Sequence, residues 1–114
     1  NKMICLPQDG LKEHWQGMVW LNPPYGKDIF KWLAKLSNHG DGIALVFART
    51  DTKWFHAARS LCTDYYFFKG RIKFLNEKLE QRTNAGHGSM LFTFGREANL
   101  RVINAKHKNL LNLA

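Results

Sequence analysis

The residues best suited to chemistry are four consecutive ones: Asn22, Pro23, Pro24 and Tyr25. An amino group conjugated to an aromatic ring is a poor nucleophile, because its lone pair is delocalised. Two acceptors aimed at its hydrogens would pull the nitrogen towards sp³ geometry and stabilise the developing charge. The Asn22 side-chain oxygen and the Pro23 carbonyl can be these acceptors, in a loop that two prolines stiffen. Tyr25 offers a flat face for a stacked base, a contact worth about 1–3 kcal/mol. The alternative is a proline-rich turn in which Tyr25 only packs.

The segments on either side predict a strand before this tetrapeptide and a helix after it. Residues 18–22 form a short apolar run that stops at the proline pair, which is typical of a buried strand. Residues 27–38 repeat apolar side chains at the spacing of one helix face. Loops that follow the carboxyl ends of parallel strands are where such folds bind ligands. The position of the tetrapeptide therefore favours a functional loop.

Strands and helices continue to alternate along the rest of the chain. The expected elements are a strand at 43–48, a helix at 52–61 capped by Asp51 or Thr50, a strand at 65–68, a segment at 71–74 that extends it or forms a fourth strand, and a strand at 89–94. A polar loop at 76–88 is a candidate for DNA recognition and equally for disorder. Residues 97–114 are a basic tail, at best a weak helix. This order predicts an α/β fold with a mostly parallel sheet.

Composition excludes several classes of protein. The chain has 114 residues, of which 45% are hydrophobic and 23% charged, and these values exclude wholesale disorder. No apolar run approaches the roughly 20 residues of a membrane span, and no secretory signal is visible, so we expect a cytoplasmic protein. Cys5 and Cys62 make no disulfide framework, and the five histidines are too scattered for a structural metal site.

The net charge of +8 is concentrated in the second part of the chain. Residues 1–68 carry eight Lys and Arg against six Asp and Glu, whereas residues 69–114 carry nine against three. Such a basic segment indicates a polyanionic partner, most often a nucleic acid. A basic surface that only maintains solubility is the alternative.

The tetrapeptide and several later segments together resemble one enzyme family. These segments are Trp15, residues 19–26, Trp32-Leu33, residues 48–52, Trp54-Phe55, residues 70–74 and Ser89. In this order they resemble the phage-type, Dam-like DNA N6-adenine methyltransferases, which depend on S-adenosylmethionine. The resemblance covers roughly residues 9–94 and is to the second half of the catalytic domain.

The resemblance implies transfer of a methyl group from S-adenosylmethionine to the exocyclic amine of a flipped adenine in DNA. It makes the tetrapeptide catalytic and assigns a second set of residues to the DNA and target base: Arg49, Thr50, Asp51, Arg71, Lys73 and Ser89. Arg49 could contact a phosphate, with Asp51 orienting it, or both could belong to a helix cap with a local ion pair. Arg71 and Lys73 would share one strand face, towards DNA or simply towards solvent.

The cofactor-binding half of such an enzyme is not recognisable in this sequence, and the cofactor-binding residues are unknown. We therefore expect a single partial domain over residues 1–114, with a partial Rossmann-like fold. Three arrangements are open: a fragment, a remnant that forms a homodimer over its exposed sheet edge, or a chain completed by a separate chain. The competing functions are a catalytically inactive DNA-binding module and an amino methyltransferase that acts on protein glutamine or RNA.

Overall fold

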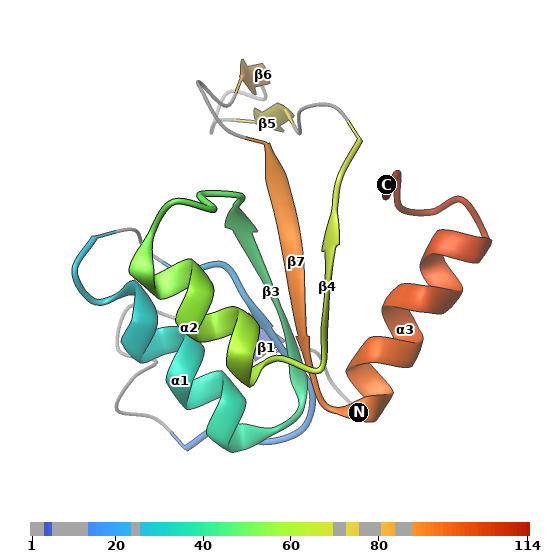
Figure 1. Ribbon diagram of the computed structural model, residues 1–114. Helices are drawn as coiled ribbons and strands as arrows, with labels where there is room; N and C mark the ends of the chain where they lie inside the picture. The colour runs from blue at the N-terminus through green and yellow to red at the C-terminus, as the bar shows by residue number, and fades with distance from the viewer. Residues whose placement is uncertain (1–3, 6–13, 24–25, 70–72, 76–80, 84–87) are drawn as a thin grey trace.

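The computed structural model describes residues 4–5, 14–23, 26–69, 73–75, 81–83 and 88–114. Five strands form one sheet in the order β1-β2-β3-β7-β4, and two more form a separate hairpin (Figure 1). The bounds of the elements are β1 Ile4–Cys5, β2 Val19–Leu21, α1 Ile29–His39, β3 Gly42–Phe47, α2 Lys53–Leu61, β4 Asp64–Phe67, β5 Lys73–Leu75, β6 Gln81–Thr83, β7 Ser89–Phe94 and α3 Arg96–His107. The prediction of an α/β fold is confirmed.

The sheet is mixed rather than mostly parallel in its pairing. β1 pairs with β2, and β2 with β3, in parallel, whereas β7 lies antiparallel between β3 and β4. The strand predicted at 89–94 is therefore present but runs against its neighbours. The apolar run alone could not reveal this, since a buried strand has the same composition in either direction.

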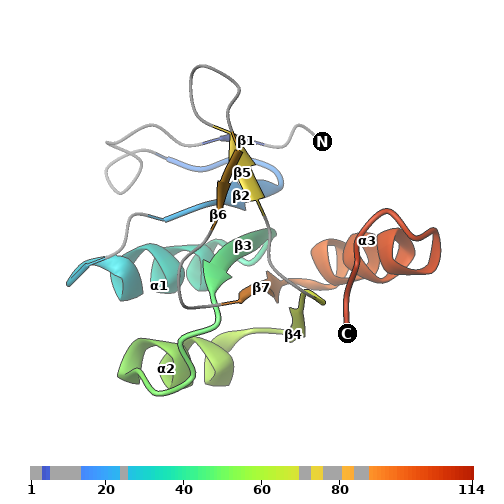
Figure 2. The same ribbon diagram turned by 90° about the horizontal axis from the view of Figure 1, so that it is seen from above.

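Helices α1 and α2 cover one face of the sheet, and α3 covers the other (Figure 2). Alternation along the strands supplies both faces, because successive side chains of a strand point to opposite sides. Val19 and Leu21 of β2 belong to the cluster packed under α1 and α2. Trp20, between them, packs with the cluster on the α3 side. Among the described residues, no helix has the length and apolarity that crossing a membrane requires.

Two predicted helices form where the periodicity places them. α1 buries Ile29, Trp32, Leu33 and Leu36 and ends at Gly40, whose φ of 78° is the left-handed conformation that glycine adopts readily. α2 begins one residue later than its predicted start, and its N-cap is Thr52, not Asp51 or Thr50. The Thr52 side chain accepts a hydrogen bond from the Phe55 backbone N–H at 3.3 Å. The prediction of the cap was wrong because three adjacent residues all have capping side chains.

The C-terminal segment, where we expect at best a weak helix, forms a longer and better packed helix. α3 spans 12 residues and packs against the sheet through Ala98 and Val102. The polar face of α3 carries the hydrogen bonds that orient the helix. The apolar stripe of α3 is therefore narrow, and the helical periodicity of this segment is weak in the sequence. The residues that follow α3 return to β4: the Ala114 N–H donates to the Phe67 carbonyl at 2.7 Å, and the Lys69 N–H to the Asn112 carbonyl at 2.8 Å.

The segment after β4 does not extend that strand. β5 pairs antiparallel with β6, with Phe74 opposite Arg82, in a hairpin apart from the main sheet. The hairpin lies at the end of the sheet where β3 finishes and β7 starts (Figure 1). The predicted loop at 76–88 thus contains a strand, while residues 76–80 and 84–87 lie outside the described residues.

Candidate functional site

The candidate catalytic loop begins where β2 ends. Asn22 is exposed and Pro23 is buried, directly after Leu21. Among the described residues, no hydrogen bond engages the Asn22 side chain. Pro24 and Tyr25 lie outside the described residues, so their predicted roles are untested. The amide of Asn22 is therefore accessible to a ligand, on a loop that Pro23 anchors to the core.

The segment before β2 is fixed to α1, which holds the start of this loop in place. Trp15 is buried and stacks on Trp32, with ring centroids 6.5 Å apart and an interplanar angle of 23°. The Lys35 ammonium lies 4.5 Å from the centroid of the Trp15 ring. The His39 Nε2 atom is 2.6 Å from the Gly17 carbonyl oxygen. Helix α1 thus holds the chain that precedes Asn22.

At the far side of the loop, Gly26 leads into α1. Its φ of 132° is a conformation that other residues rarely adopt, although a Cβ there would meet no neighbouring atom. The Gly26 carbonyl accepts a hydrogen bond from the Ile29 N–H at 3.3 Å. Asp28, at the N-cap of α1, forms a salt bridge with Lys31 at 3.2 Å. The exit from the loop is therefore set by backbone conformation and a local ion pair.

The second predicted group follows β3, the strand next to β2. Leu21 pairs with Ala44, so β3 continues for three residues beyond the level of Leu21, to Phe47. Three residues of strand measure roughly 10 Å. Asn22 and Arg49 thus follow neighbouring carboxyl ends, as predicted, but at different heights along the sheet.

Residues 49–52 form a tight turn that is closed by two hydrogen bonds, one from the Thr52 backbone and one from the Thr52 side chain. The Arg49 carbonyl accepts from the Thr52 N–H at 3.1 Å and from the Thr52 hydroxyl at 2.7 Å. Arg49, Thr50 and Asp51 are exposed. The described residues contain no salt bridge between Arg49 and Asp51, so they support neither the orientation of Arg49 by Asp51 nor the alternative of a local ion pair. The turn presents the Arg49 and Asp51 side chains to solvent.

The remaining predicted residues do not join Asn22 as a single surface. Ser89 begins β7 opposite Phe47 and is only 2% exposed, so its side chain faces the interior. Lys73 begins β5 in the hairpin, and Arg71 lies outside the described residues. Phe55 is buried in the core cluster under α1 and α2, and Trp54 is partly buried against it.

One polar cluster was missed by the sequence analysis. The Tyr66 hydroxyl donates to the Asn99 side-chain oxygen at 2.6 Å, and the Thr93 hydroxyl donates to the same oxygen at 2.9 Å. Burial raises the pKa of the Tyr66 phenol above its usual value, and Asp64 raises it further. Burial, followed by Asp64, also raises the pKa of the Cys62 thiol. The cluster ties α3 to β4 and β7; its only sequence signal is an asparagine within a helix.

The described residues do not make up a site for S-adenosylmethionine. Such a site must accept hydrogen bonds from a ribose diol, for which proteins with similar sheets use a carboxylate. Asp28, the first described carboxylate after Asn22 in the chain, already pairs with Lys31. The pocket described below, on the α3 side of the sheet, is lined by Arg101 and Lys108 and by no acidic residue.

Comparison with protein families gives one result that bears on this geometry. The family model described as DNA N-6-adenine-methyltransferase (Dam) matches residues 1–112. No curated protein and no solved structure matches the chain. The match spans the loop at Asn22, the turn at 49–52 and the hairpin together.

Proposed function

Since the chain belongs to the Dam family of DNA N-6-adenine-methyltransferases, we propose that Asn22 and Pro23 bind the exocyclic amine of an adenine that has left the DNA stack. The observation that carries this proposal is the exposed Asn22 amide, free of hydrogen bonds to described residues, at the carboxyl end of a buried parallel strand. An amide in this state loses no internal hydrogen bond when it accepts one from an amine.

The proposed chemistry needs no titrating base on this chain. The Asn22 oxygen and the Pro23 carbonyl each accept one hydrogen of the amine. These bonds localise the nitrogen lone pair and stabilise positive charge as the nitrogen is methylated. The methylated ammonium then loses a proton to water. Tyr25 stacks on the extruded base, and this contact offsets part of the free energy lost when the base leaves the DNA stack.

We propose S-adenosylmethionine as the methyl donor, on the basis of family membership. Its binding would have to involve residues outside the described ones, or a second chain. A homodimer or a complementing chain along the edge strand β1 is the corresponding structural proposal, because an edge strand has unpaired backbone groups.

For DNA contacts we propose the Arg49 turn and the β5–β6 hairpin. Arg49 and Asp51 are exposed beyond the tip of β3, and the hairpin lies at the same end of the sheet. A cation there would neutralise a phosphate and position the duplex without reading its sequence. Ser89 is proposed as a support for this end of the sheet rather than as a direct DNA contact, because it is buried.

The test is methylation of an adenine-containing duplex by the purified chain with S-adenosylmethionine, with N6-methyladenine quantified by mass spectrometry. Parallel reactions contain an RNA of the same sequence and a glutamine-containing peptide. Product in the DNA reaction supports the proposal. Methylation of the RNA or the peptide alone would favour the other amino methyltransferase function, and DNA binding without any product would favour the inactive DNA-binding module.

A further inference from the structure

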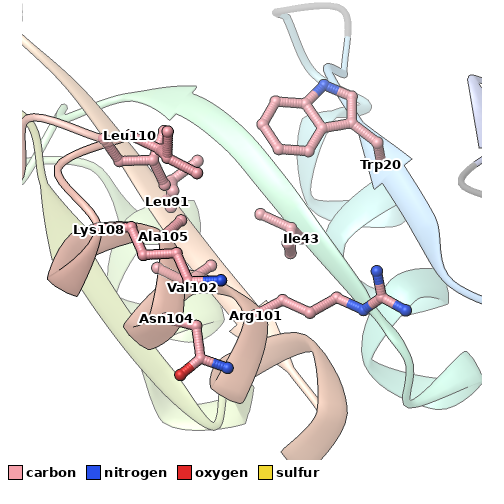
Figure 3. A pocket seen from close by; sticks show the side chains of 10 residues that line it. Trp20, Ile43, Leu91, Arg101, Val102, Asn104, Ala105, Lys108 and Leu110 are labelled. Carbon is pink, nitrogen blue, oxygen red and sulfur yellow. The ribbon is translucent and has the colours of Figure 1, made fainter.

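α3 covers only part of its face of the sheet and leaves a pocket beside it (Figure 3). The pocket has a volume of about 370 Å³, within the roughly 300–1,000 Å³ typical of small-molecule sites. Its lining comes from three strands, from α3 and from the residues after α3: Trp20, Ile43, Leu91, Arg101, Val102, Asn104, Ala105, Lys108, Leu110 and Leu111. It lies away from Asn22, on the face opposite α1 and α2.

The interior of this pocket is apolar, and one of its walls is aromatic. Ile43 and Leu91 are buried and come from neighbouring strands. The Trp20 indole is partly buried and leans over the space between β2 and α3, as Figure 3 shows. Leu110, on the opposite side, is 72% exposed. A flat apolar body between Trp20 and α3 would cover surface that now faces water.

The charged groups of the pocket are both positive. Arg101 and Ala105 share one side of α3, and Lys108, the C-cap residue, follows Ala105 at helical spacing. Arg101 extends from α3 towards the strands on the Trp20 side (Figure 3). The described residues give neither Arg101 nor Lys108 a salt-bridge partner, and no acidic residue lines the pocket. An anion bound here would meet two cations and no opposing carboxylate.

We propose that this pocket binds a small aromatic anion: a flat ring system against Trp20, with one anionic group held by Arg101 and Lys108. The apolar lining beside Trp20 favours the flat ring system, and the two cations favour the anionic group. Nucleotides and aromatic carboxylic acids share this chemistry. A second copy of the chain is a poorer occupant, because each copy has a net charge of +8 and would bring further cations to Arg101 and Lys108.

The first experiment compares two fluorescent probes that differ in charge. 8-Anilinonaphthalene-1-sulfonate carries the anion, and N-phenyl-1-naphthylamine has the same rings without it. We expect saturable 1:1 binding of the sulfonate and binding of the neutral probe at least ~10-fold weaker, because only the sulfonate can form charge-assisted hydrogen bonds with Arg101 and Lys108. Equal affinity for the two probes would overturn the proposal.

Variants on the solvent side of α3 locate the site without disturbing the core. Arg101→Glu and Lys108→Glu should each weaken binding of the sulfonate, and Ala105→Trp should abolish it by filling the space between α3 and Trp20. Arg96→Glu is the matched control: it changes the net charge equally and lies on the same helix, but not at the pocket. Unchanged melting temperatures would show that the variants are folded. Equal losses in Arg96→Glu and Arg101→Glu would contradict the proposed site.

Competition distinguishes the two sources of ligand. Adenosine monophosphate and 1-naphthoate are titrated separately against the bound sulfonate probe. Displacement by the nucleotide identifies a nucleotide site, and displacement by naphthoate alone identifies a site for aromatic carboxylic acids. Displacement by neither, or release of the probe only when the chain self-associates in sedimentation experiments, would overturn the proposal.

Discussion

Leu21 of β2 lies opposite Ala44 of β3 in parallel register, and this pairing sets the shape of the candidate site. β2 ends at that level, whereas β3 continues to Phe47. Asn22 is therefore set back along the flank of a longer strand, and the Arg49 turn lies farther out. A nucleic acid that contacts Arg49 would have to extend a base inward to reach Asn22, which is the geometry that base extrusion requires.

The outer position of Arg49 predicts a contribution to DNA binding that depends on salt. Arg49→Ala should weaken binding to any duplex and reduce the slope of log K against log salt by about one, the effect of losing one phosphate contact. Fluorescence anisotropy at several salt concentrations measures both quantities. Arg96→Ala is the control, because Arg96 starts α3 after β7 has crossed to the other end of the sheet. An unchanged slope for Arg49→Ala would show that Arg49 only faces solvent.

Thr52 caps α2 through its side chain and also closes the Arg49 turn. Thr52→Ala should reduce the free energy of unfolding by about 1 kcal/mol, the usual cost of losing an N-cap side chain. Thr52→Ser, which keeps the hydroxyl, should restore most of it. Urea denaturation of the three proteins provides the measurement. Equal stabilities of the Ala variant and the wild type would contradict the assigned cap.

Asn99 accepts hydrogen bonds from both Tyr66 and Thr93. Its removal leaves each hydroxyl only a longer bond to Asp64, at 3.4 Å for Tyr66 and 3.2 Å for Thr93. Asn99→Ala should therefore destabilise the chain by about 1 kcal/mol. Tyr66→Phe removes only one donor and should cost less. If the two residues act through this bond, the double variant is more stable than the sum of the single losses predicts. Additive losses would argue against the coupling.

Tyr66 also predicts how stability changes at high pH. Its pKa is raised in the folded chain, so the folded state binds the phenolic proton more tightly than the unfolded state does. The stability that Tyr66 contributes is fully present below the pKa of an unfolded tyrosine, about 10, and is lost as pH rises through the pKa in the folded state. Tyr66→Phe should therefore show a smaller loss of stability between pH 9 and 11. Parallel pH curves for the two proteins would contradict this.

Elements with strong periodicity were predictable from the sequence, and those defined by long-range pairing were not. The stripe Ile29, Trp32, Leu33 and Leu36 located α1 to within two residues. The direction of β7 depends on its pairing with β3 and β4, which no local pattern encodes. α3 was underestimated because only Ala98 and Val102 of this helix are buried, while Asn99 turns a polar side chain towards the strands, and this weakens the helical pattern.

The position of the candidate site along the chain was predictable, but the relative heights and burial of its residues were not. A proline pair after an apolar run correctly located Asn22 at the end of a strand. That Ser89 is buried, and that the Arg49 turn stands beyond Asn22, both follow from strand register. Register is set by contacts between segments distant in sequence, so the spacing of residues along one segment does not reveal it.

We propose that the Asn22 amide oxygen binds the adenine amine as it is methylated, and a comparison of variants at this position tests the proposal. Formation of N6-methyladenine in duplex DNA is measured for the wild type, Asn22→Ala and Asn22→Asp, with DNA affinity measured in parallel. We predict that Asn22→Ala reduces turnover by about 100- to 1,000-fold, the usual cost of one transition-state hydrogen bond. Asn22→Asp keeps an acceptor and should retain more activity, with DNA affinity little changed in both. Wild-type turnover that persists in Asn22→Ala would contradict the claim.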